Sequence, residues 1–329
     1  MKPRVLCKFG IKSGVDYHRI ARPIRHLEEK GLIEARYWHK GSENISETGM
    51  PKDDLEWATH FFFSRQPGVN VPVFAFFTLL KHFGVRVVVD QDDSFNLPEW
   101  HTSKKAYDDG YVDRMIDSTK LADEVWTTNE TLAEELKVYN SNVHIIPNSI
   151  AHTDPQWKLP KSKGKKGLRF GYLGAQHHLR DLEWSGIDLS GLEGYSTGGK
   201  ASAYEAYGDA LNAKYHIDSM SPHDYGKMYS VLDVSLVPLE PTPFAACKSN
   251  LKLLEAGFSK TAAICTNTPP YGEFADCVVY VEPGDDWNEV IRSMTKRDVK
   301  RRALALNKAV QVYSMDAINE LRLDRLNGC

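Results

Sequence analysis

Short apolar runs alternate with longer amphipathic patterns along the whole chain of 329 residues, and this alternation constrains the fold more than any other feature. The runs in the first half are nearly unbroken, which is typical of strands covered by helices on both faces of a parallel sheet. The expected strands are Arg4–Cys7, Ala58–Ser64, Val85–Val89, Glu124–Thr127 and Val143–Ile146. Helical spacing of apolar residues predicts helices over Tyr17–Lys30 and Leu132–Leu136.

A basic stretch separates the two halves of the chain. Between Lys158 and Arg169 there are six basic residues and no acidic ones, together with proline and glycine, which indicates a solvated linker. The strands expected beyond it are Leu168–Leu173, Tyr215–Ile217, Val231–Val237, Ala262–Thr266 and Cys277–Val281, followed by a helix over Lys296–Val312. We therefore expect an α/β protein with two doubly wound Rossmann-like domains facing a cleft. The expected limits are 1–157 and 158–312, with a helix at 313–329 returning to the first domain.

Composition places the chain among ordinary globular proteins, with 41 basic and 44 acidic residues and a net charge of −3. The uncharged run Gln66 to Leu80 has 15 residues and two prolines, whereas a membrane span needs about 20 residues. Basic residues interrupt the apolar N-terminus, which does not match a signal peptide. The five cysteines are widely spaced and suggest neither a disulfide framework nor a zinc site. We expect a cytoplasmic protein without a transmembrane segment.

The segment Val231–Gly257 reads as a strand, a proline-containing loop and a helix that begins close to Cys247. The first turn of such a helix presents unpaired N–H groups and the positive end of the helix dipole, which suits a phosphate. On one helix, Lys248, Lys252 and Glu255 would share a face and could serve a diphosphate and a ribose together. The alternative is a surface helix in which Lys252 and Glu255 form an ordinary pair.

Three aspartates, Asp90, Asp92 and Asp93, immediately follow a predicted strand and are expected at the ligand edge of the sheet. Adjacent carboxylates repel one another unless cations or hydrogen bonds offset their charges. They could make polar contacts to a ligand, or one of them could act as a general base. A divalent-metal site built on Asp90 and Asp92 is the competing interpretation, and an aspartate turn that caps the next segment is a third.

A glycine-rich segment, Gly194 to Lys200, satisfies most of a P-loop pattern, but Ala201 stands where a Ser or Thr must reach magnesium. We expect a surface loop there. The adjacent His177 and His178 do not converge on one metal ion. His178 could reach a ligand from its loop or lie at the surface.

Several longer segments resemble one enzyme family. The runs PLEPTPFAACKSNLKLLEAG, GYLGAQHHLRDL, ADEVWTTNETLAEELK, IIPNSI and SGVDYHRIARPIRHLEEKG are similar to segments of GT-B-fold glycosyltransferases of the family 4 kind, over most of the chain. The resemblance implies transfer of a sugar from a nucleotide-sugar donor, with a UDP-sugar expected, to an acceptor hydroxyl. It implies retention of the anomeric configuration and no requirement for a metal or other cofactor. The first domain would be the acceptor side and the second would bind the nucleotide-sugar.

Position by position, the resemblance assigns Glu255 to the donor ribose and the turn Lys248, Ser249 and Asn250 to the diphosphate. The remaining donor-side positions are Gly14, Gly174, His178 and Lys252, with Ser219 and Met220 near the nucleobase. Asp92 and Lys248 are the catalytic candidates, and the acceptor-side candidates are Asp90, Asp93 and Thr128.

Two departures from the family pattern affect the catalytic assignment. Cys247 stands where a second glutamate is usual, eight positions before Glu255, and the usual Arg and Lys pair is not plainly matched after Gly174. A non-catalytic nucleotide-sugar-binding protein is therefore one alternative. The acceptor class stays open. A nucleic-acid base is an alternative acceptor, because two basic segments, Lys158–Arg169 and Lys296–Arg302, could track phosphates while Trp100 or Trp126 stacks on a base.

Overall fold

The computed structural model describes residues 2–10, 13–39, 52–68, 70–162, 167–174, 178–198 and 201–328. The chain forms two compact units. The first comprises Met1–Ser149, Cys247–Ser249 and Met315–Cys329, and the second comprises Ile150–Ala246 and Asn250–Ser314. The domain limits and roles expected from the sequence stay a prediction.

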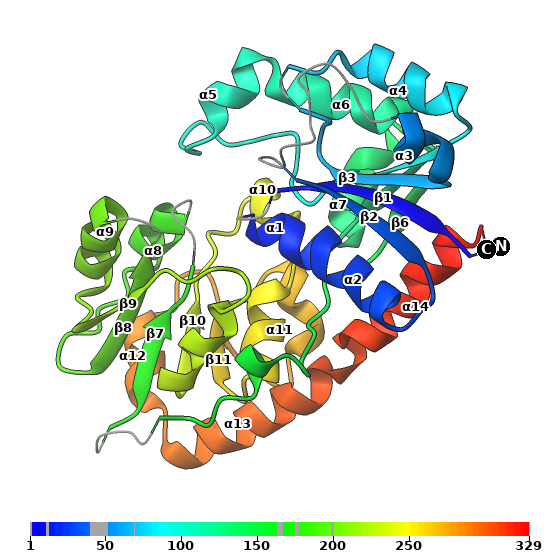
Figure 1. The fold of residues 1–329 in the computed structure, drawn as a ribbon. Helices are drawn as coiled ribbons and strands as arrows, with labels where there is room; N and C mark the ends of the chain where they lie inside the picture. The colour runs from blue at the N-terminus through cyan, green and yellow to red at the C-terminus, as the bar shows by residue number, and fades with distance from the viewer. Residues whose placement is uncertain are drawn as a thin grey trace. The chain divides into compact units, whose positions relative to one another are not determined.

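The first unit is built on a six-stranded parallel sheet in the order β2-β1-β3-β4-β5-β6 (Figure 1). Its strands are β1 (Arg4–Phe9), β2 (Glu34–His39), β3 (His60–Ser64), β4 (Arg86–Asp90), β5 (Glu124–Thr127) and β6 (Val143–Ile145). Phe61, Phe62 and Phe63 in β3 are all buried, as expected for a strand inside a sheet covered on both faces. The register pairs Ser64 with Asp90, so the residues that follow β3 and β4 emerge together at the carboxyl edge of the sheet.

Helices of the first unit connect these strands in sequence order, and one last helix follows the second unit. They are α1 (Gly14–Asp16), α2 (Arg22–Glu29), α3 (Lys52–Trp57), α4 (Val73–His82), α5 (Lys104–Ala106), α6 (Val112–Leu121), α7 (Glu130–Lys137) and α14 (Met315–Leu326). A wider π-helical turn, Tyr17–Ala21, joins α1 to α2, and a similar segment, Tyr107–Tyr111, joins α5 to α6. The predicted helix over Tyr17–Lys30 therefore begins earlier, at Gly14, because Ser13 caps it: the Asp16 N–H donates to the Ser13 hydroxyl.

The second unit contains a six-stranded parallel sheet in the order β12-β11-β10-β7-β8-β9. Its strands are β7 (Arg169–Tyr172), β8 (Glu193–Gly198), β9 (Tyr215–Asp218), β10 (Val234–Val237), β11 (Ala262–Thr266) and β12 (Val279–Val281). Its α-helices are α8 (Leu179–Ser185), α9 (Ala201–Leu211), α10 (Pro243–Ala246), α11 (Leu251–Phe258), α12 (Trp287–Ser293) and α13 (Lys296–Ala309). Shorter 3₁₀ turns cover Pro155–Trp157, Tyr225–Val231, Pro269–Phe274 and Val310–Tyr313.

Alternate residues along β11 belong to two different core clusters. Ala263 and Cys265 pack with Leu253 and Leu254 of α11, whereas Ala262 and Ile264 belong to the cluster with α8, α9 and α12. This two-sided burial explains why the strand reads as a continuous apolar run. The expected α/β class with two doubly wound Rossmann-like sheets is confirmed. Among the described residues, no helix is both long and apolar enough to cross a bilayer.

Two strands escaped the sequence analysis. β2 carries charged and aromatic residues on the edge of its sheet, and β8 contains the Gly194–Gly198 part of the expected surface loop, so that expectation was wrong for these residues. Gly199 and Lys200 lie outside the described residues. Gly194 is required by packing, because a Cβ there would lie 2.7 Å from Cβ of Leu189. The glycines in this segment suggested a loop, but Gly194 lies in a strand and is required because a neighbouring segment packs closely against it.

The basic stretch from Lys158 to Arg169 is only partly a solvated linker. Lys161 donates hydrogen bonds to the carbonyl oxygens of Tyr229 and Leu232, both at 2.8 Å, and Arg169 is buried at the start of β7. Residues 163–166 lie outside the described residues. Two of the six cations are therefore part of the packed second unit, which a charge pattern alone does not indicate.

Candidate functional site

Asp90, the last residue of β4, forms a buried ion pair with Arg19 from the π-helical turn. Arg19 donates from Nε to Oδ1 at 2.9 Å and from Nη2 to Oδ2 at 2.7 Å, and both side chains are at most 2% exposed. Arg19 Nη1 also donates to the carbonyl oxygen of Ile146 at 2.6 Å. The pair therefore ties three segments of the first unit together. Burial favours a structural role for Asp90 over the acceptor contact expected from the sequence.

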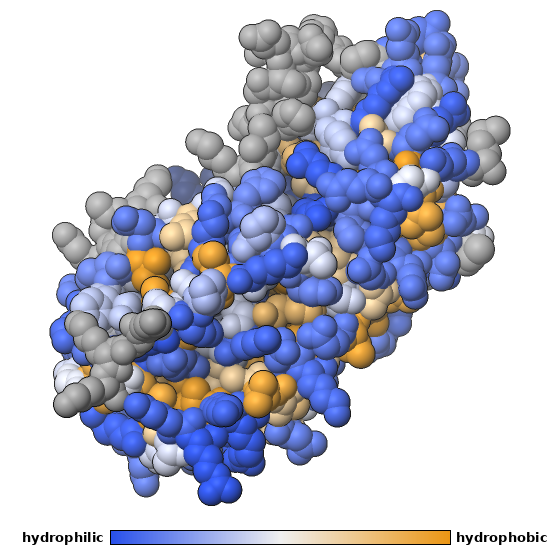
Figure 2. Space-filling model, turned by 60° about the horizontal axis from the view of Figure 1, so that its bottom comes forward, coloured by the Kyte–Doolittle hydropathy of each residue, from blue (hydrophilic) through white to orange (hydrophobic). Residues whose placement is uncertain are grey.

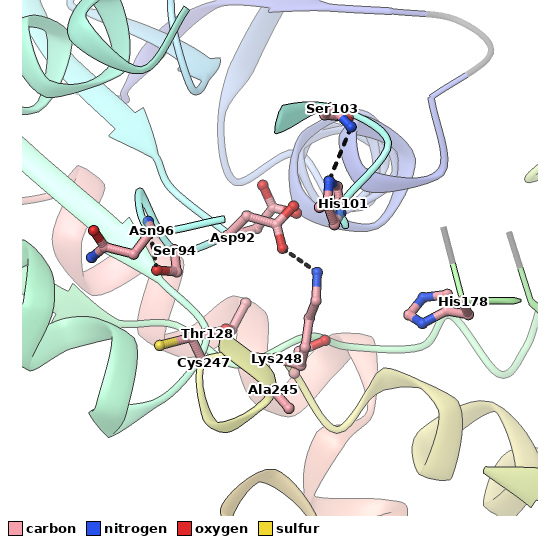
Figure 3. A network of polar contacts seen from close by, with 12 residues as sticks. Asp92, Ser94, Asn96, His101, Ser103, Thr128, His178, Ala245, Cys247 and Lys248 are labelled. Atoms are coloured by element: carbon pink, nitrogen blue, oxygen red, sulfur yellow. Dashed lines mark hydrogen bonds and ion pairs between the residues drawn. The ribbon is translucent and has the colours of Figure 1, made fainter. Parts of the chain in front are cut away.

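Asp92 and Asp93 lie beyond the end of β4 and are held by cations of the same unit. Arg65 Nε donates to Asp92 at 2.9 Å, Arg65 Nη2 donates to Asp93 at 2.7 Å, and the Lys248 ammonium donates to Asp93 at 2.6 Å. Figure 3 shows the Lys248 side chain extending toward this aspartate pair. Despite burial, Lys248 and Arg65 hold the pKa of Asp93 well below its usual range. Two carboxylates balanced by two cations explain how the aspartates coexist.

The metal interpretation of this cluster finds no support in its geometry. Asp90 is occupied by Arg19, and Asp92 and Asp93 already accept hydrogen bonds from Arg65 and Lys248. Across the described part of the chain, no three His, Cys, Asp or Glu side chains are placed to hold a metal ion. The carboxylates of this cluster form charged hydrogen bonds with arginine and lysine side chains of the same unit.

The sequence analysis missed Arg65, which the structure distinguishes by its unusual backbone conformation. It follows β3 with φ 62°, a left-handed conformation that is uncommon for residues other than glycine. Its N–H donates to the Asp90 carbonyl oxygen at 2.8 Å, which fixes the turn, while its guanidinium spans both aspartates. Sequence carries no signal for this because any residue type can precede a turn. Such local strain is commonly found at functional sites.

The segment Cys247–Ser249 was expected in the first turn of a helix, and this expectation was wrong. α10 ends at Ala246, and α11 begins at Leu251 with Asn250 as its N-cap. Asn129 donates from Nδ2 to the carbonyl oxygens of Cys247 at 2.9 Å and Lys248 at 3.1 Å. Hydrogen bonds from another part of the chain hold these residues outside the helix. Lys248 consequently does not share a helix face with Lys252 and Glu255.

Ser249 and Thr128 each accept a hydrogen bond from a different asparagine of the first unit. Ser249 Oγ accepts a hydrogen bond from Asn148 Nδ2 at 2.9 Å, and Thr128 Oγ1 accepts one from Asn129 Nδ2 at 3.1 Å. Thr128 is 7% exposed. Both predicted site residues are thus fixed in position within the first unit.

Cys247 stands where the resemblance leads one to expect a glutamate, and a different carboxylate lies beside it. The Cys247 thiol lies 3.7 Å from Oε2 of Glu135, a residue of α7. Glu135 also accepts hydrogen bonds from the Ser94 hydroxyl at 2.8 Å and the Phe95 N–H at 2.7 Å. Burial, together with the charge of Glu135, raises the pKa of Cys247 to about 11, so this sulfur is a thiol at neutral pH. Spacing along the chain could not reveal Glu135, since it is distant in sequence.

The loop after β1 leaves room at Gly14. Asp16 accepts hydrogen bonds from the Gly10 N–H at 2.7 Å and from the Ser64 hydroxyl, which shapes the loop. Among the described residues, a Cβ atom built on Gly14 would meet nothing within 4 Å. The backbone at the start of α1 is therefore approachable, as expected for a position near a ligand.

In the second unit, Glu255 of α11 is 4% exposed and accepts a hydrogen bond from the Tyr229 hydroxyl at 3.0 Å. Burial raises the pKa of Glu255 to about 7, with Lys252 and Tyr229 opposing that rise. A carboxylate is the side chain that accepts hydrogen bonds from hydroxyl donors. Tyr229, inside a 3₁₀ turn, is a partner that sequence reasoning missed.

Lys252, in the first turn of α11, reaches the carboxyl end of β7. Its ammonium donates to the Leu173 carbonyl oxygen at 2.6 Å and lies 5.0 Å from the centre of the Tyr172 ring. Asn250 makes no side-chain cap to the helix, since its amide donates to Glu273 at 2.8 Å. Lys252 thus links the start of α11 to the residue that precedes Gly174.

Gly174 follows Leu173 in a position where only glycine fits without rearrangement. A Cβ there would lie 2.1 Å from the Tyr172 hydroxyl oxygen. That hydroxyl is buried and has no hydrogen-bond partner among the described residues. A buried phenol without a partner is uncommon, and it lies under the turn expected to face the donor.

The other donor-side candidates differ in their surroundings. His178 precedes α8, and its Nδ1 lies 2.8 Å from Oδ2 of Asp181, whose Oδ1 accepts a hydrogen bond from the Glu240 N–H. His177 lies outside the described residues. Ser219 and Met220 follow β9 and are exposed. His178 therefore is an oriented imidazole near the end of β7, whereas Ser219 and Met220 form an open edge.

Comparison with known proteins gives a consistent picture of the fold. Neither a protein-family model nor a curated protein sequence matches the chain. Among solved structures it is similar to HepE from Anabaena in complex with UDP-glucose, with a TM-score of 0.64, 9% identity and coverage of 99% of this chain and 100% of that one. It is also similar to a UDP-forming α,α-trehalose-phosphate synthase from Burkholderia vietnamiensis, with a TM-score of 0.62, 8% identity and coverage of 100% and 99%. A third similar structure is AviGT4, a glycosyltransferase involved in avilamycin A biosynthesis, with a TM-score of 0.57, 10% identity and coverage of 99% of each chain.

These likenesses extend over nearly the whole chain and show a shared GT-B fold at very low sequence identity.

Proposed function

We propose that the protein is a glycosyltransferase that moves a sugar from a UDP-sugar to an acceptor hydroxyl. The observation that carries the proposal is the arrangement at the carboxyl edge of the second sheet, where Lys252, the start of α11 and the Gly174 turn lie together and Glu255 follows one turn later. Structures with this fold include one in complex with UDP-glucose and a UDP-forming synthase.

The proposed donor site assigns each group a distinct task. The N–H groups of α11 and Lys252 bind the diphosphate, and Glu255 accepts hydrogen bonds from the ribose hydroxyls. The exposed edge at Ser219 and Met220 receives the uracil. Cleavage of the sugar–phosphate bond adds negative charge to the leaving diphosphate, so fixed positive groups stabilise the transition state more than the bound donor.

On the acceptor side, we propose that Asp92 contacts the attacking hydroxyl and that Lys248, oriented by Asp93, contributes positive charge to the leaving group. Gly14, Ser249 and Asn250 would present backbone or short polar groups to the phosphates, with His178 near the transferred sugar. Retention of the anomeric configuration and independence of metals rest on the family resemblance. We propose a hydroxyl on a sugar-containing acceptor rather than a nucleic-acid base.

The nucleic-acid alternative loses part of its basis in the structure. Trp126 is 0% exposed and cannot stack on a base, although Trp100 is 39% exposed. In the basic stretch, Lys161 and Arg169 are engaged with groups of the second unit.

The proposal is tested by thermal denaturation with UDP, GDP, ADP and UDP-glucose, followed by measurement of UDP release with EDTA present. UDP and its sugar should raise the melting temperature, because a ligand that binds the folded state stabilises it. Glu255→Gln should reduce the shift, while the exposed control Glu289→Gln of α12 should not. Inhibition by EDTA would contradict metal independence, and an inverted product in NMR would contradict retention.

A non-catalytic nucleotide-sugar-binding protein is the second candidate, favoured by the thiol of Cys247 in place of a carboxylate. Binding of UDP-glucose with no UDP release above the uncatalysed rate, with or without a sugar acceptor panel, would support it. Release of UDP that depends on Lys248 would exclude it.

A further inference from the structure

The second unit contains a cavity of about 450 Å³ that the proposed function does not use. Its lining includes Arg169 at the start of β7, Asp233 just before β10 and Lys260 just before β11, so it lies at the edge where these strands begin. Gly174 follows the other end of β7. The cavity is therefore separate from the candidate donor edge.

Two basic segments that are far apart in the sequence meet at this cavity. Lys161 and Arg169 come from the stretch before β7, and Lys296 and Lys300 come from the first turns of α13. Together with Lys260 they give the cavity a strongly cationic lining. The sequence pattern indicated two separate basic segments, whereas the fold brings residues of both to the same cavity.

The inner wall of the cavity is built from cations that are already committed. Lys161 donates to the carbonyl oxygens of Tyr229 and Leu232, and to the Thr261 hydroxyl. Arg169 donates to Asp233 from Nε at 2.9 Å and from Nη2 at 2.8 Å. The carboxylate in the lining is thus neutralised by Arg169 and does not offset the remaining charges.

The rim carries three lysines whose charges are not balanced in this way. Lys260, Lys296 and Lys300 are exposed, and none forms an ion pair within the part of the chain that the structure describes. Lys260 has φ 52°, and its N–H donates to the Gly257 carbonyl oxygen at 3.0 Å, so its backbone direction is fixed. Like charges around one cavity repel one another, and a bound anion would relieve that repulsion.

Apolar side chains complete the cavity. Leu168, Val299, Ala303 and Leu304 belong to its lining, and Leu304 is 55% exposed. Figure 2 brings forward the side of the molecule along which α13 runs in Figure 1, and it shows hydrophobic surface bordered by strongly hydrophilic residues. A ligand that fits this lining carries both negative charge and an apolar part.

Lys161 lies in the buried part of the wall, where its charged form is disfavoured. Burial lowers the pKa of Lys161 to about 7, and Arg169 acts in the same direction, while Asp233 opposes them. A multivalent anion bound nearby would raise that pKa.

We propose that this cavity binds a small phosphate-bearing ligand, with its anionic groups between Lys260, Lys296 and Lys300 and its apolar part against Leu304. The volume lies within the range of about 300–1,000 Å³ that is usual for small-molecule pockets. An open hollow with one apolar side and three lysines at its rim suits a compact ligand better than a nucleic-acid backbone, which follows an extended basic stripe.

The test is calorimetric titration of the full chain with inorganic tripolyphosphate at constant ionic strength. The site variant is Lys296→Gln with Lys300→Gln. Its control is Arg297→Gln with Lys308→Gln, which removes the same charge from exposed positions of α13 that do not line the cavity. We expect the site variant to bind about tenfold more weakly or not at all and the control to bind like the unmodified protein. Glutamine favours helices, so both variants should fold.

Several outcomes would overturn the proposal. These are equal losses in site and control variants, no binding by the unmodified protein, and binding of a duplex oligonucleotide without binding of tripolyphosphate. Because the proposed diphosphate site at the other edge of the sheet also attracts tripolyphosphate, the site and control variants are compared again with Lys252→Met added, and the loss in the site variant should persist. Since the assay uses neither a UDP-sugar nor turnover, its failure would leave the proposed transferase activity standing, and loss of that activity would leave this result standing.

Discussion

Replacing Glu255 by glutamine should make the protein more stable at alkaline pH, although it removes a proposed ligand-binding group. Glu255 is buried against Tyr229, and its pKa rises from 4.5 to about 7. A group whose pKa is raised by folding favours the folded state fully at low pH, and this advantage is lost as the pH rises through the folded value. Above pH 7 the protein therefore bears the full cost of burying an ionised carboxylate.

The size of that cost follows from the pKa. Since each tenfold change in proton affinity corresponds to about 1.4 kcal/mol, the rise corresponds to about 3 kcal/mol at pH 8. Glu255→Gln keeps the shape and can still accept a hydrogen bond from Tyr229, but it carries no charge. For a unit of this size about 3 kcal/mol corresponds to a gain of about 6–12 °C in melting temperature.

The assay is thermal and urea denaturation at pH 5 and pH 8, without nucleotide. At pH 5 Glu255 is protonated in the folded protein, so the variant and the unmodified protein should nearly coincide, and the gain should appear between pH 5 and 8. The exposed control Glu289→Gln should show no such dependence. A variant that is equally stable or less stable at pH 8, or a gain of the same size at both pH values, would refute the reasoning.

Three further substitutions test the ion pair of Asp93, the packing at Gly174 and the buried ion pair of Arg19. Asp93→Asn should lower stability at pH 7 by about 1.5–3 kcal/mol in urea denaturation. Because the pKa of Asp93 is depressed, the deficit should shrink as the pH falls below about 4; a deficit independent of pH would contradict the ion-pair assignment. Gly174→Ala should lower the melting temperature, because the new Cβ would collide with the Tyr172 hydroxyl. Gly14→Ala places its Cβ in open space and should leave the melting temperature unchanged. Equal effects of the two substitutions would count against the packing argument. Arg19→Ala should cost about 3–5 kcal/mol, because it leaves a carboxylate buried without its ion-pair partner. Lys52→Ala removes an ion pair between two exposed side chains and should cost less than about 1 kcal/mol. Similar losses in the two variants would contradict the importance of burial.

Much of the fold was predictable because helix-covered parallel strands leave a simple pattern in the chain. Glu124–Thr127 and Ala262–Thr266 have the predicted bounds, since both are buried runs flanked by turn residues. The pattern fails where packing decides. β8 contains Gly194 because Leu189 approaches it, and β2 is an edge strand with charged residues, so neither resembles a buried strand.

The candidate site was only partly predictable for a related reason. Chemically distinctive residues near strand ends, such as Asp92 and Glu255, could be chosen from the sequence. Their partners Arg65 and Tyr229 could not, because they come from segments that are distant in the chain and carry no pattern of their own.

The helix near Lys248 shows most clearly what the sequence alone did and did not determine. Apolar periodicity indicated a helix that runs through Lys252 and Glu255, and it indicated the order of strands and helices around it. Only the tertiary structure decided that Lys248 and Ser249 stay outside that helix, since the side chains of Asn129, Asn148 and Asp93 bind them. The physical reason is that helix formation depends on local hydrogen bonds of small net energy, which several tertiary hydrogen bonds to the same residues can outweigh.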